Sequence, residues 1–541
     1  MEFMRRSLIQ LGLVVLLVIT SVGSAYAATN AYDAKYVTSV TYMNIGSYPA
    51  NLNLTFYVSG TGSTVEYQLL DIDGSARVIP VKASATLAVS TVSALNSDSK
   101  YGAVVTSNQQ LIATMAQVAN DTIIRTQPIS NGFAASDASS TIVLPAVMKS
   151  CFSDELTTRF SVQNAGSAAI SDLTITLKWP NGVSTTSGIT VPSALAAGDV
   201  LHFDMSSVSV GAVPSRVTLP TGCAFSGSAL ISSATVGSKL VATAVELSTV
   251  NKYANSYEGM PGNTSDGALT LYFPSAMCRV NYGDGEQSTS YAVQNLTSAS
   301  ANIVVEYTYR IRATDGSLGT EQNKTLRLTI PANGKGSITG CDLSKNTVGN
   351  TNDATGSGMP AAAVGSAIIT SNRNIVGLQK ISGGGISAAT PAIITGGDIV
   401  NTPFVRYSVS CFTATPTATV CRNESRQRTF FAVQNIGNAP AKIRMNLYNH
   451  LGVLVGTYTT PSLVAIGGKV SLDPTKATSG TALNEFGYNV EGSNLIYAGS
   501  AQFKSLNNAG NASLSSIAVV VRVLSMTPLG QTGDDYNGTP Q

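Results

Sequence analysis

Hydrophobic and polar residues alternate in short runs along most of the chain. Residues 52–58, 173–179, 303–309 and 443–447 each place apolar side chains at every second position. This period of two is the pattern of a half-buried β-strand. Because runs with a helical period are absent, the pattern predicts an all-β protein.

The runs are separated by turn residues and by prolines. Such punctuation favours hairpins, and proline fits best where a strand starts. We therefore predict antiparallel β-sandwiches of seven to nine short strands each, of the broad immunoglobulin-like architecture. The turns are Asp73-Gly74, Asn181-Gly182, Asp315-Gly316 and Leu451-Gly452, and the proline steps are Ile79-Pro80, Val191-Pro192, Ile330-Pro331 and Thr460-Pro461.

A short motif recurs once per predicted sandwich. Val-Gln-Asn ends at Asn164, Asn295 and Asn435, and a weaker Tyr-Met-Asn ends at Asn44. The spacing of 120 to 140 residues is too long for a solenoid repeat and suits tandem copies of one compact module. Each asparagine precedes a turn-like segment, so we expect it to serve that turn, because asparagine tolerates left-handed backbone and hydrogen-bonds locally.

The repeat divides the chain into five segments. We predict a signal peptide at 1–27, β-sandwiches at 28–138, 139–266 and 267–397, and a fourth sandwich with a C-terminal tail at 398–541. These four sandwiches are called modules 1 to 4.

The tail resembles the joints between modules. Asp535–Thr539 is similar to Ser256–Met260 and to Ile129–Phe133. Two interpretations follow: the tail is an ordinary frayed terminus, or it docks on module 1 of the next copy and gives head-to-tail polymers.

The first residues have the pattern of an export signal. Arg5 and Arg6 are followed by an apolar run at Leu11–Ile19 and by Ala25-Tyr26-Ala27, which fits a cleavage site. The apolar run is shorter than a membrane span requires. The mature chain is therefore expected to begin near Ala28, and no later segment is predicted to span a membrane.

Six cysteines in an exported chain indicate disulfides. Equivalent positions within the modules favour Cys151–Cys223 and Cys278–Cys341, and proximity in sequence favours Cys411–Cys421. Free thiols are the alternative. Zinc binding is disfavoured because the chain has no Cys-x-x-Cys pair. Each long-range bond is expected to add up to about 4 kcal/mol through the entropy of the unfolded chain.

Charge is scarce in this chain. Only 11% of its 541 residues are charged, the net charge is +2, and 43% are hydrophobic. The lack of a basic block argues against nucleic acid as a partner. Low charge also gives little repulsion between copies. The composition therefore favours a homo-oligomer or polymer.

Residues for catalysis are sparse. The two histidines, His202 and His450, fall in different modules, and no Gly-x-Ser-x-Gly motif occurs. The acidic pairs Asp71/Asp73 and Asp284/Glu286 offer oxygen ligands for calcium, although turn chemistry explains the Asp-Gly steps better. We expect no enzyme activity, no catalytic residues and no required cofactor or metal, with calcium as the less favoured alternative.

Eight Asn-x-Ser/Thr sequons are candidate glycosylation sites. A sequon permits N-glycosylation in a suitable host but does not demonstrate it. They are Asn53, Asn120, Asn263, Asn295, Asn323, Asn423, Asn511 and Asn537.

The export signal, the Phe-x-Val-Gln-Asn-x-Gly hairpins and the low charge together resemble tandem β-sandwich surface proteins of bacteria, such as S-layer, sheath, filament and adhesin proteins. The resemblance implies a secreted, cell-surface structural protein that self-assembles into a layer, sheath or filament. The alternative is a surface adhesin or carbohydrate-binding protein, with cell-envelope glycans as partners. Four modules in line would form a rod of about 150 Å.

Overall fold

The structure is a computed structural model. It describes residues 28–541 except 71–73, 122, 125, 216, 221, 284, 342–354, 416–417, 478–486, 491–493, 514 and 528–529, and it leaves undescribed the side chains of strand residues 407–426, 487–490, 494–498, 526–527 and 530. All strand pairs in this part of the chain are antiparallel, and the helical elements there are two 3-10 turns, Val89–Thr91 and Pro474–Ala477. The prediction of an all-β, antiparallel protein is confirmed.

Module 1 contains two four-stranded sheets with the orders β5-β1-β7-β8 and β3-β2-β4, in which β6 also pairs with β2. The strands are β1 (Tyr36–Asn44), β2 (Ala50–Val58), β3 (Thr64–Gln68), β4 (Val78–Ile79), β5 (Ser84–Ala88), β6 (Tyr101–Ser107), β7 (Leu111–Ala119) and β8 (Ile129–Asn131).

Module 2 also contains two sheets, with the orders β12-β10-β14-β15 and β11-β13-β9-β16. The strands are β9 (Thr141–Lys149), β10 (Leu156–Asn164), β11 (Thr174–Lys178), β12 (Val200–Asp204), β13 (Phe225–Ser232), β14 (Leu240–Ser248), β15 (Ala254–Glu258) and β16 (Met260–Pro261).

Module 3 is a nine-stranded system in which β24 pairs with β17, β19, β20 and β25. The strands are β17 (Ala268–Cys278), β18 (Val280–Asn281), β19 (Glu286–Asn295), β20 (Ala301–Ile311), β21 (Gln322–Ile330), β22 (Lys335–Thr339), β23 (Thr355–Gly356), β24 (Ala363–Gly383) and β25 (Ile386–Pro391).

Module 4 is a ten-stranded system with the main order β29-β28-β32-β26-β27-β33-β34. The strands are β26 (Ile399–Thr415), β27 (Ala418–Asn435), β28 (Lys442–Asn449), β29 (Leu454–Thr459), β30 (Lys469–Leu472), β31 (Gly487–Val490), β32 (Asn494–Leu506), β33 (Ile517–Thr527), β34 (Gly530–Asn537) and β35 (Thr539–Pro540).

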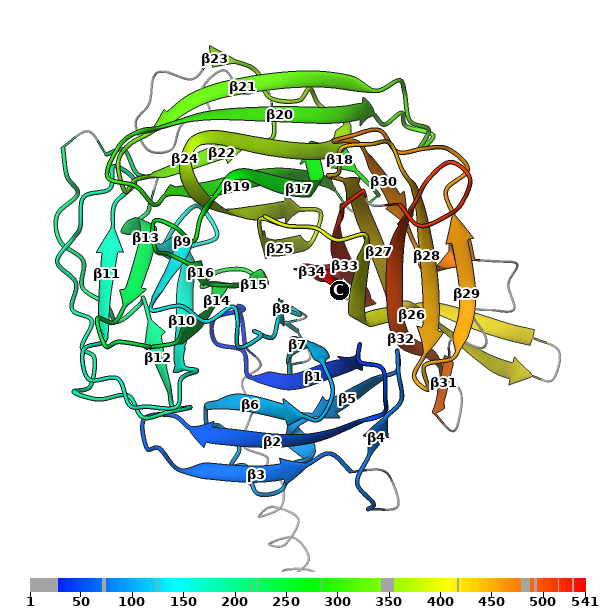
Figure 1. The fold of residues 1–541 in the computed structure, drawn as a ribbon, viewed down its shortest axis with the longest axis horizontal. Helices are drawn as coiled ribbons and strands as arrows, with labels where there is room; N and C mark the ends of the chain where they lie inside the picture. Colours follow the sequence, from blue (N-terminus) through cyan, green and yellow to red (C-terminus); the bar gives the residue numbers. More distant parts are fainter. Residues whose placement is uncertain are drawn as a thin grey trace, which may run out of the picture.

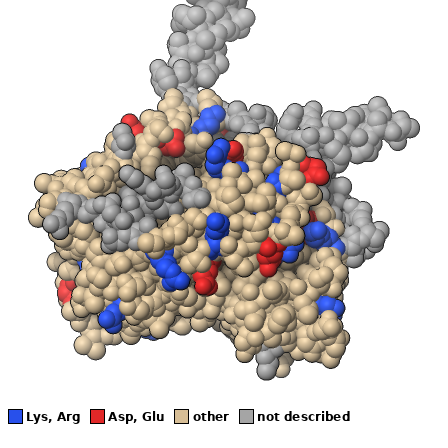
Figure 2. All heavy atoms as spheres, turned by 90° about the horizontal axis from the view of Figure 1, so that it is seen from above, with Lys and Arg blue, Asp and Glu red and all other residues tan. Residues whose placement is uncertain are grey.

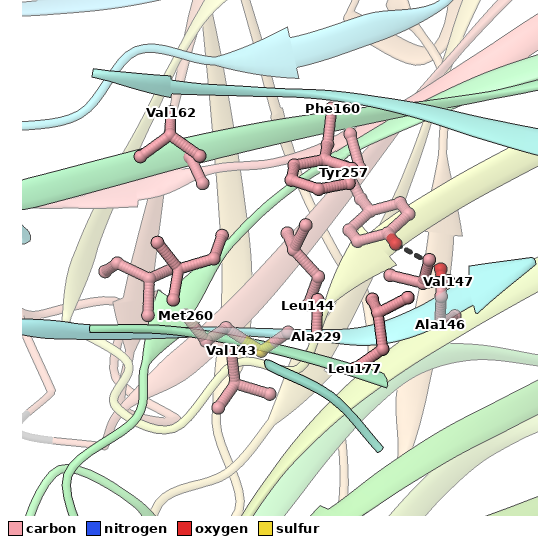
Figure 3. Close-up of a cluster of buried hydrophobic side chains, with 14 of the residues drawn as sticks. Val143, Leu144, Ala146, Val147, Phe160, Val162, Leu177, Ala229, Tyr257 and Met260 are labelled. Carbon is pink, nitrogen blue, oxygen red and sulfur yellow. Dashed lines mark hydrogen bonds between the residues drawn. The ribbon is translucent and has the colours of Figure 1, made fainter. Parts of the chain in front are cut away.

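Alternation in the sequence translates directly into burial. On β20, Ile303, Val305 and Tyr307 are at most 1% exposed, while the residues between them are exposed or half-buried. Each module contributes most of one apolar cluster, and the clusters of modules 2 and 4 also include side chains of modules 3 and 1, respectively. Figure 3 shows the cluster of module 2, where side chains of β9 and β10 meet Tyr257 of β15. The cores bury the apolar side of each strand, which explains why the period of two recurs.

Three prolines lie in the middle of strands, whereas the sequence favoured strand starts for proline. Pro145, Pro274 and Pro403 lie inside β9, β17 and β26. At each position the pairing register shifts, between the partners of residues 144 and 147, 273 and 276, and 402 and 405. A proline has no N–H to give to the ladder, and a bulge removes the need for one.

The four modules follow one another around a closed ring (Figure 1). Each junction carries hydrogen bonds between neighbouring modules. They include Ser59 Oγ to Val200 O (3.0 Å), Lys335 Nζ to Gly227 O (3.2 Å), Ser366 Oγ to Gly467 O (2.9 Å) and Ser500 Oγ to Lys82 O (2.8 Å). The last of these joins module 4 to module 1, so the expected rod of modules in line is wrong.

The middle of the ring is occupied by one strand from each module. Figure 1 places β8, β15, β25 and β34 there, and β15 contacts the other three. β8, β15 and β34 overlap the predicted joint motifs at 129–133, 256–260 and 535–539, and β25 ends shortly before the predicted boundary between modules 3 and 4. Joints that look like linkers in the sequence are therefore the core around which the modules close.

No helix in the described part of the chain is both long and apolar enough to cross a membrane. The predicted signal peptide, 1–27, lies outside the described residues.

Candidate functional site: the closed centre of the ring

The repeated asparagine performs the same task in every module. Asn44, Asn164, Asn295 and Asn435 are each 0% exposed. In each, Oδ1 accepts the N–H two residues on, and Nδ2 donates to the carbonyl four residues on and to a carbonyl 29 to 36 residues later. The accepting residues are Tyr48 and Ile79, Ala168 and Leu195, Ala299 and Pro331, and Ala439 and Val464.

These hydrogen bonds close a hairpin turn and attach it to a second loop. The side chain of each asparagine thus uses its acceptor and both donors inside its own module. The structure therefore gives this motif a structural role, as its position before a turn indicated.

Two of the predicted disulfides join strands or loops of one module. Cys151 bonds to Cys223, and Cys278 bonds to Cys341. Cys411 and Cys421 lie opposite each other in the register of β26 and β27, while their side chains lie outside the described residues. The third bond therefore stays a prediction.

The sequons differ in their access to solvent. Asn53, Asn120, Asn323 and Asn511 are exposed, and Asn263 and Asn537 are half-buried. The side chain of Asn423 lies outside the described residues. Asn295 is fully buried and both of its amide hydrogens are used, so the folded module has no room for a glycan at this position.

The two histidines are separate. His202 Nδ1 lies 2.7 Å from Ser161 Oγ, and burial lowers its pKa to about 4, so its ring is neutral at physiological pH. Burial also lowers the pKa of His450. Both side chains lie in the modules predicted for them.

The calcium candidates fall largely outside the described part of the chain. Asp71, Asp73 and Asp284 are not described, and Glu286 accepts a hydrogen bond from Arg279 Nε at 2.9 Å. No group of three or more His, Cys, Asp or Glu side chains that could hold a metal occurs among the described residues.

The chemistry of the ring's centre is dominated by Asp534 of β34. Oδ2 accepts the N–H groups of Ile129 (2.8 Å) and Ser256 (3.0 Å), and Oδ1 accepts those of Ala389 (3.0 Å) and Asp535 (2.8 Å). One carboxylate thus binds backbone of all four modules. Burial raises the pKa of this carboxyl group well above its usual range, and the N–H groups of Ile129, Ser256 and Asp535 oppose that rise.

Further polar contacts surround this carboxylate. Asn131 Nδ2 donates to Asn537 O, and Asn537 Nδ2 donates to Pro391 O, each at 2.9 Å. Asn131 N donates to Glu258 Oε1. These bonds link the ends of the central strands of modules 1 to 4, so the centre is a connected polar network.

Two buried ion pairs flank the centre. Arg522 binds Asp535 through two hydrogen bonds of 2.8 Å, within module 4. Lys380 of module 3 binds Glu246 of module 2, whose side chain is 0% exposed. A buried pair is costly to break, because the remaining partner stays charged without compensation. The Lys380–Glu246 pair therefore favours one fixed arrangement of modules 2 and 3.

Burial changes the ionisation of two groups near the junctions. It raises the pKa of Glu258 to about 7, and hydrogen bonds from backbone N–H groups oppose that rise. It lowers the pKa of Lys335 to about 7, assisted by the positive charge of Lys380. Lys335 is 4% exposed and reaches from module 3 into module 2.

The C-terminal tail docks inside the ring. β35 pairs with β26, Gln541 Nε2 donates to Ile45 O (3.4 Å), and Lys82 Nζ donates to Gln541 Oε1 (3.2 Å). The tail thus behaves as an internal joint, but its partner is module 1 of the same chain. Neither a frayed terminus nor docking on a second copy describes it.

A polar cleft of about 240 Å³ lies at the junction of modules 2 and 3. Lys178, Asn263, Thr264 and Gln294 line it. Gln294 is 3% exposed, and its Oε1 has no hydrogen-bond partner among the described residues. The cleft therefore offers an unused acceptor to a small polar molecule.

Two comparisons with known proteins give no relative. No family model matches the chain, and no curated protein is significantly similar to it.

Sequence reasoning missed the network around Asp534. The available signal was the pair Asp534-Asp535 in a chain with few charges, beside a joint motif that recurs at Ser256–Met260. The donors to Asp534 are backbone N–H groups, which have no residue-specific signature in a sequence.

Proposed function

We propose that the protein is an exported structural protein whose closed ring is the repeating unit of a cell-surface layer, sheath or filament. A single observation carries the proposal: the edge strand β29 of module 4 and its flanking loops contain no charged residue, and the outer edge of β29 has no partner strand in the described part of the chain. A free, uncharged edge is a template for pairing with another chain.

Residues 445–468 contain no Asp, Glu, Lys or Arg. The segment includes β29, which pairs with β28 and with no other strand in the described part of the chain. Five large apolar side chains of the segment are 42 to 56% exposed, namely Leu451, Val453, Leu454, Leu463 and Ile466. A rim of this kind lacks the charges that usually protect an edge.

Two other rim strands carry exposed charge. On β21, Lys324 and Arg327 are exposed, and the strand is also paired with β23. On β3, Glu66 is exposed. Figure 2, which shows the edge that is uppermost in Figure 1, has charges of both signs scattered among uncharged residues. The contrast with β29 supports β29 as the contact between copies.

We infer that β29 pairs with β29 of a second copy about a two-fold axis. Antiparallel pairing of one strand with itself is an isologous contact and needs no second specialised surface. A layer or filament needs a second contact, which would join one β29-linked pair of rings to the next pair.

The test compares assembly of the mature chain with that of Leu454→Lys. Electron microscopy and sedimentation of the unmodified chain should show assemblies, and Leu454→Lys should shift the population to single rings. Leu318→Lys is the matched control, because Leu318 is 53% exposed in a turn of module 3 and Leu454 is 52% exposed. Single rings for the unmodified chain at high concentration would refute the proposal.

The cleft between modules 2 and 3 supports a second candidate, an adhesin that binds a glycan. Gln294 Oε1 could accept a hydroxyl group, and Lys178 lines the same cleft. Binding of the mature chain to a glycan array, and its loss in Gln294→Met, would favour this candidate over a purely structural role.

A further inference from the structure

The first described residues cross from module 1 to module 2. Ala31 N donates to Asn251 O (2.9 Å), and Tyr32 N donates to Ser248 O (3.0 Å). Ala31 is 0% exposed and packs with Leu247 of β14. The segment 28–35 precedes the first strand of module 1, yet its backbone is bound to module 2.

An aromatic side chain strengthens the crossing. The guanidinium carbon of Arg159 lies 3.8 Å from the centre of the Tyr32 ring, which is a cation–π contact. Tyr32 also donates its hydroxyl hydrogen to Asp204 Oδ1, and Arg159 Nε donates to Asp204 Oδ2 at 2.9 Å. These contacts hold residues 28–35 against β10 and β12 of module 2.

The start of this segment is bound to module 1. Ala28 N donates to Asp121 Oδ2 at 2.9 Å. The other oxygen, Oδ1, accepts the N–H groups of Ile123 (2.6 Å) and Ile124 (3.0 Å), which orients the carboxylate. Residues 28–35 therefore form a clasp that is attached to module 1 at both of its ends, Ala28 and Lys35, and to module 2 between them.

Ala28 is also the residue at which the export signal predicts the mature chain to begin. In the unprocessed chain its nitrogen is a neutral amide with one hydrogen. Hydrolysis of the Ala27–Ala28 bond by a signal peptidase consumes one water and leaves a carboxylate on Ala27 and an amine on Ala28. At neutral pH most of that amine is protonated.

We propose that the new α-ammonium of Ala28 forms an ion pair with Asp121, so that removal of the signal peptide completes the clasp between modules 1 and 2. A charge-assisted hydrogen bond is roughly twice as strong as a neutral one. Processing then stabilises the junction as well as releasing the chain. The proposal rests on the predicted cleavage site and is independent of the proposed assembly.

The experiment uses full mature chains with defined first residues, produced by removal of a tag that leaves no extra residue. One chain begins at Ala28, and the other begins at Ala27, which moves the ammonium by one residue. Each is made with Asp121 and with Asp121→Asn. Asparagine keeps the Oδ1 acceptor for Ile123 and Ile124, so the turn is retained.

The first readout is the labelling of the α-amine by an amine-reactive reagent at pH 7. In the chain that begins at Ala28, the ion pair should slow labelling by about five- to tenfold relative to Asp121→Asn, since a carboxylate raises the pKa of a neighbouring amine. The chain that begins at Ala27 should show little dependence on residue 121. Equal labelling rates in the two Ala28 chains would overturn the proposal.

The second readout is thermal unfolding. The Ala28 chain should melt about 2 °C above the Ala27 chain when Asp121 is present, and this difference should vanish in Asp121→Asn. A difference that persists in Asp121→Asn would refute the ion pair. Sequencing of the exported chain completes the test, because a first residue other than Ala28 would overturn the assignment.

Discussion

Replacing Asp534 with asparagine tests whether the centre of the ring couples the modules. The side chain keeps its size, but an NH₂ group takes the place of one oxygen. Each carboxylate oxygen accepts two backbone N–H groups, at distances of 2.8 to 3.0 Å. In either orientation of the amide, two N–H groups would lose their acceptor and face a donor.

The size of the effect follows from those two groups. A buried donor left unsatisfied costs about 1–3 kcal/mol. Asp534→Asn should therefore lower the free energy of unfolding by about 2–6 kcal/mol. Because the two oxygens serve different modules, either orientation should weaken a contact between modules.

The single tryptophan makes the assay specific. Trp179 is 1% exposed in the core of module 2, and its ring lies 4.8 Å from that of Phe225. Its fluorescence during denaturant unfolding reports module 2, whereas Asp534 belongs to module 4. If the closed ring couples the modules, Asp534→Asn should lower the denaturant concentration at which Trp179 fluorescence reports half-unfolding of module 2. Asp98→Asn, at an exposed carboxylate, should leave it unchanged. An unchanged midpoint for Asp534→Asn would show that the modules unfold independently and would refute the coupling.

Three further predictions concern individual groups. Asn164→Asp removes the Nδ2 donors that bind two loops. It should lower the unfolding free energy of module 2 by about 2–4 kcal/mol, measured by fluorescence-monitored denaturation. A negligible loss would contradict the structural role of the motif. The raised pKa of Glu258, about 7, means that the folded chain holds a proton that the unfolded chain releases, so stability should fall as pH rises from about 4.5 to 7. The lowered pKa of Lys335, also about 7, means that the unfolded chain binds the extra proton, so stability should rise from pH 7 to about 10. Melting temperatures across this range should show a minimum near pH 7. The falling arm should weaken in Glu258→Gln, and the rising arm should weaken in Lys335→Met. A profile that the variants leave unaltered would contradict the assignment. Peptide mapping without reduction should find Cys411 bonded to Cys421, and free thiols at both positions would exclude the third bond.

Local features of the fold could be predicted because each has a short-range cause in the sequence. Alternation at 303–309 identified a strand whose apolar face is buried, and the burial of Ile303, Val305 and Tyr307 follows from it. The motif at Asn164 indicated a turn, which the side chain closes through hydrogen bonds. Equivalent positions within the repeat also identified the partners of Cys151 and Cys278.

The arrangement of the modules could not be predicted in the same way. Closure depends on N–H groups of Ile129, Ser256 and Ala389, which any residue except proline could supply. The alternation of apolar and polar positions does not distinguish a linker between modules from a strand at the centre of the ring. The similarity of the joints indicated that the tail would dock as they do, but not that its partner was module 1 of the same chain.

Small-angle X-ray scattering of the mature chain tests the closed ring most directly. A compact body of this size has a radius of gyration of about 24 Å, whereas four modules in line over about 150 Å would give about 43 Å. Measured in dilute solution, where single chains dominate, the ring predicts the smaller value. A value near that of the rod would show that module 4 does not meet module 1, and the account of the centre would fail with it.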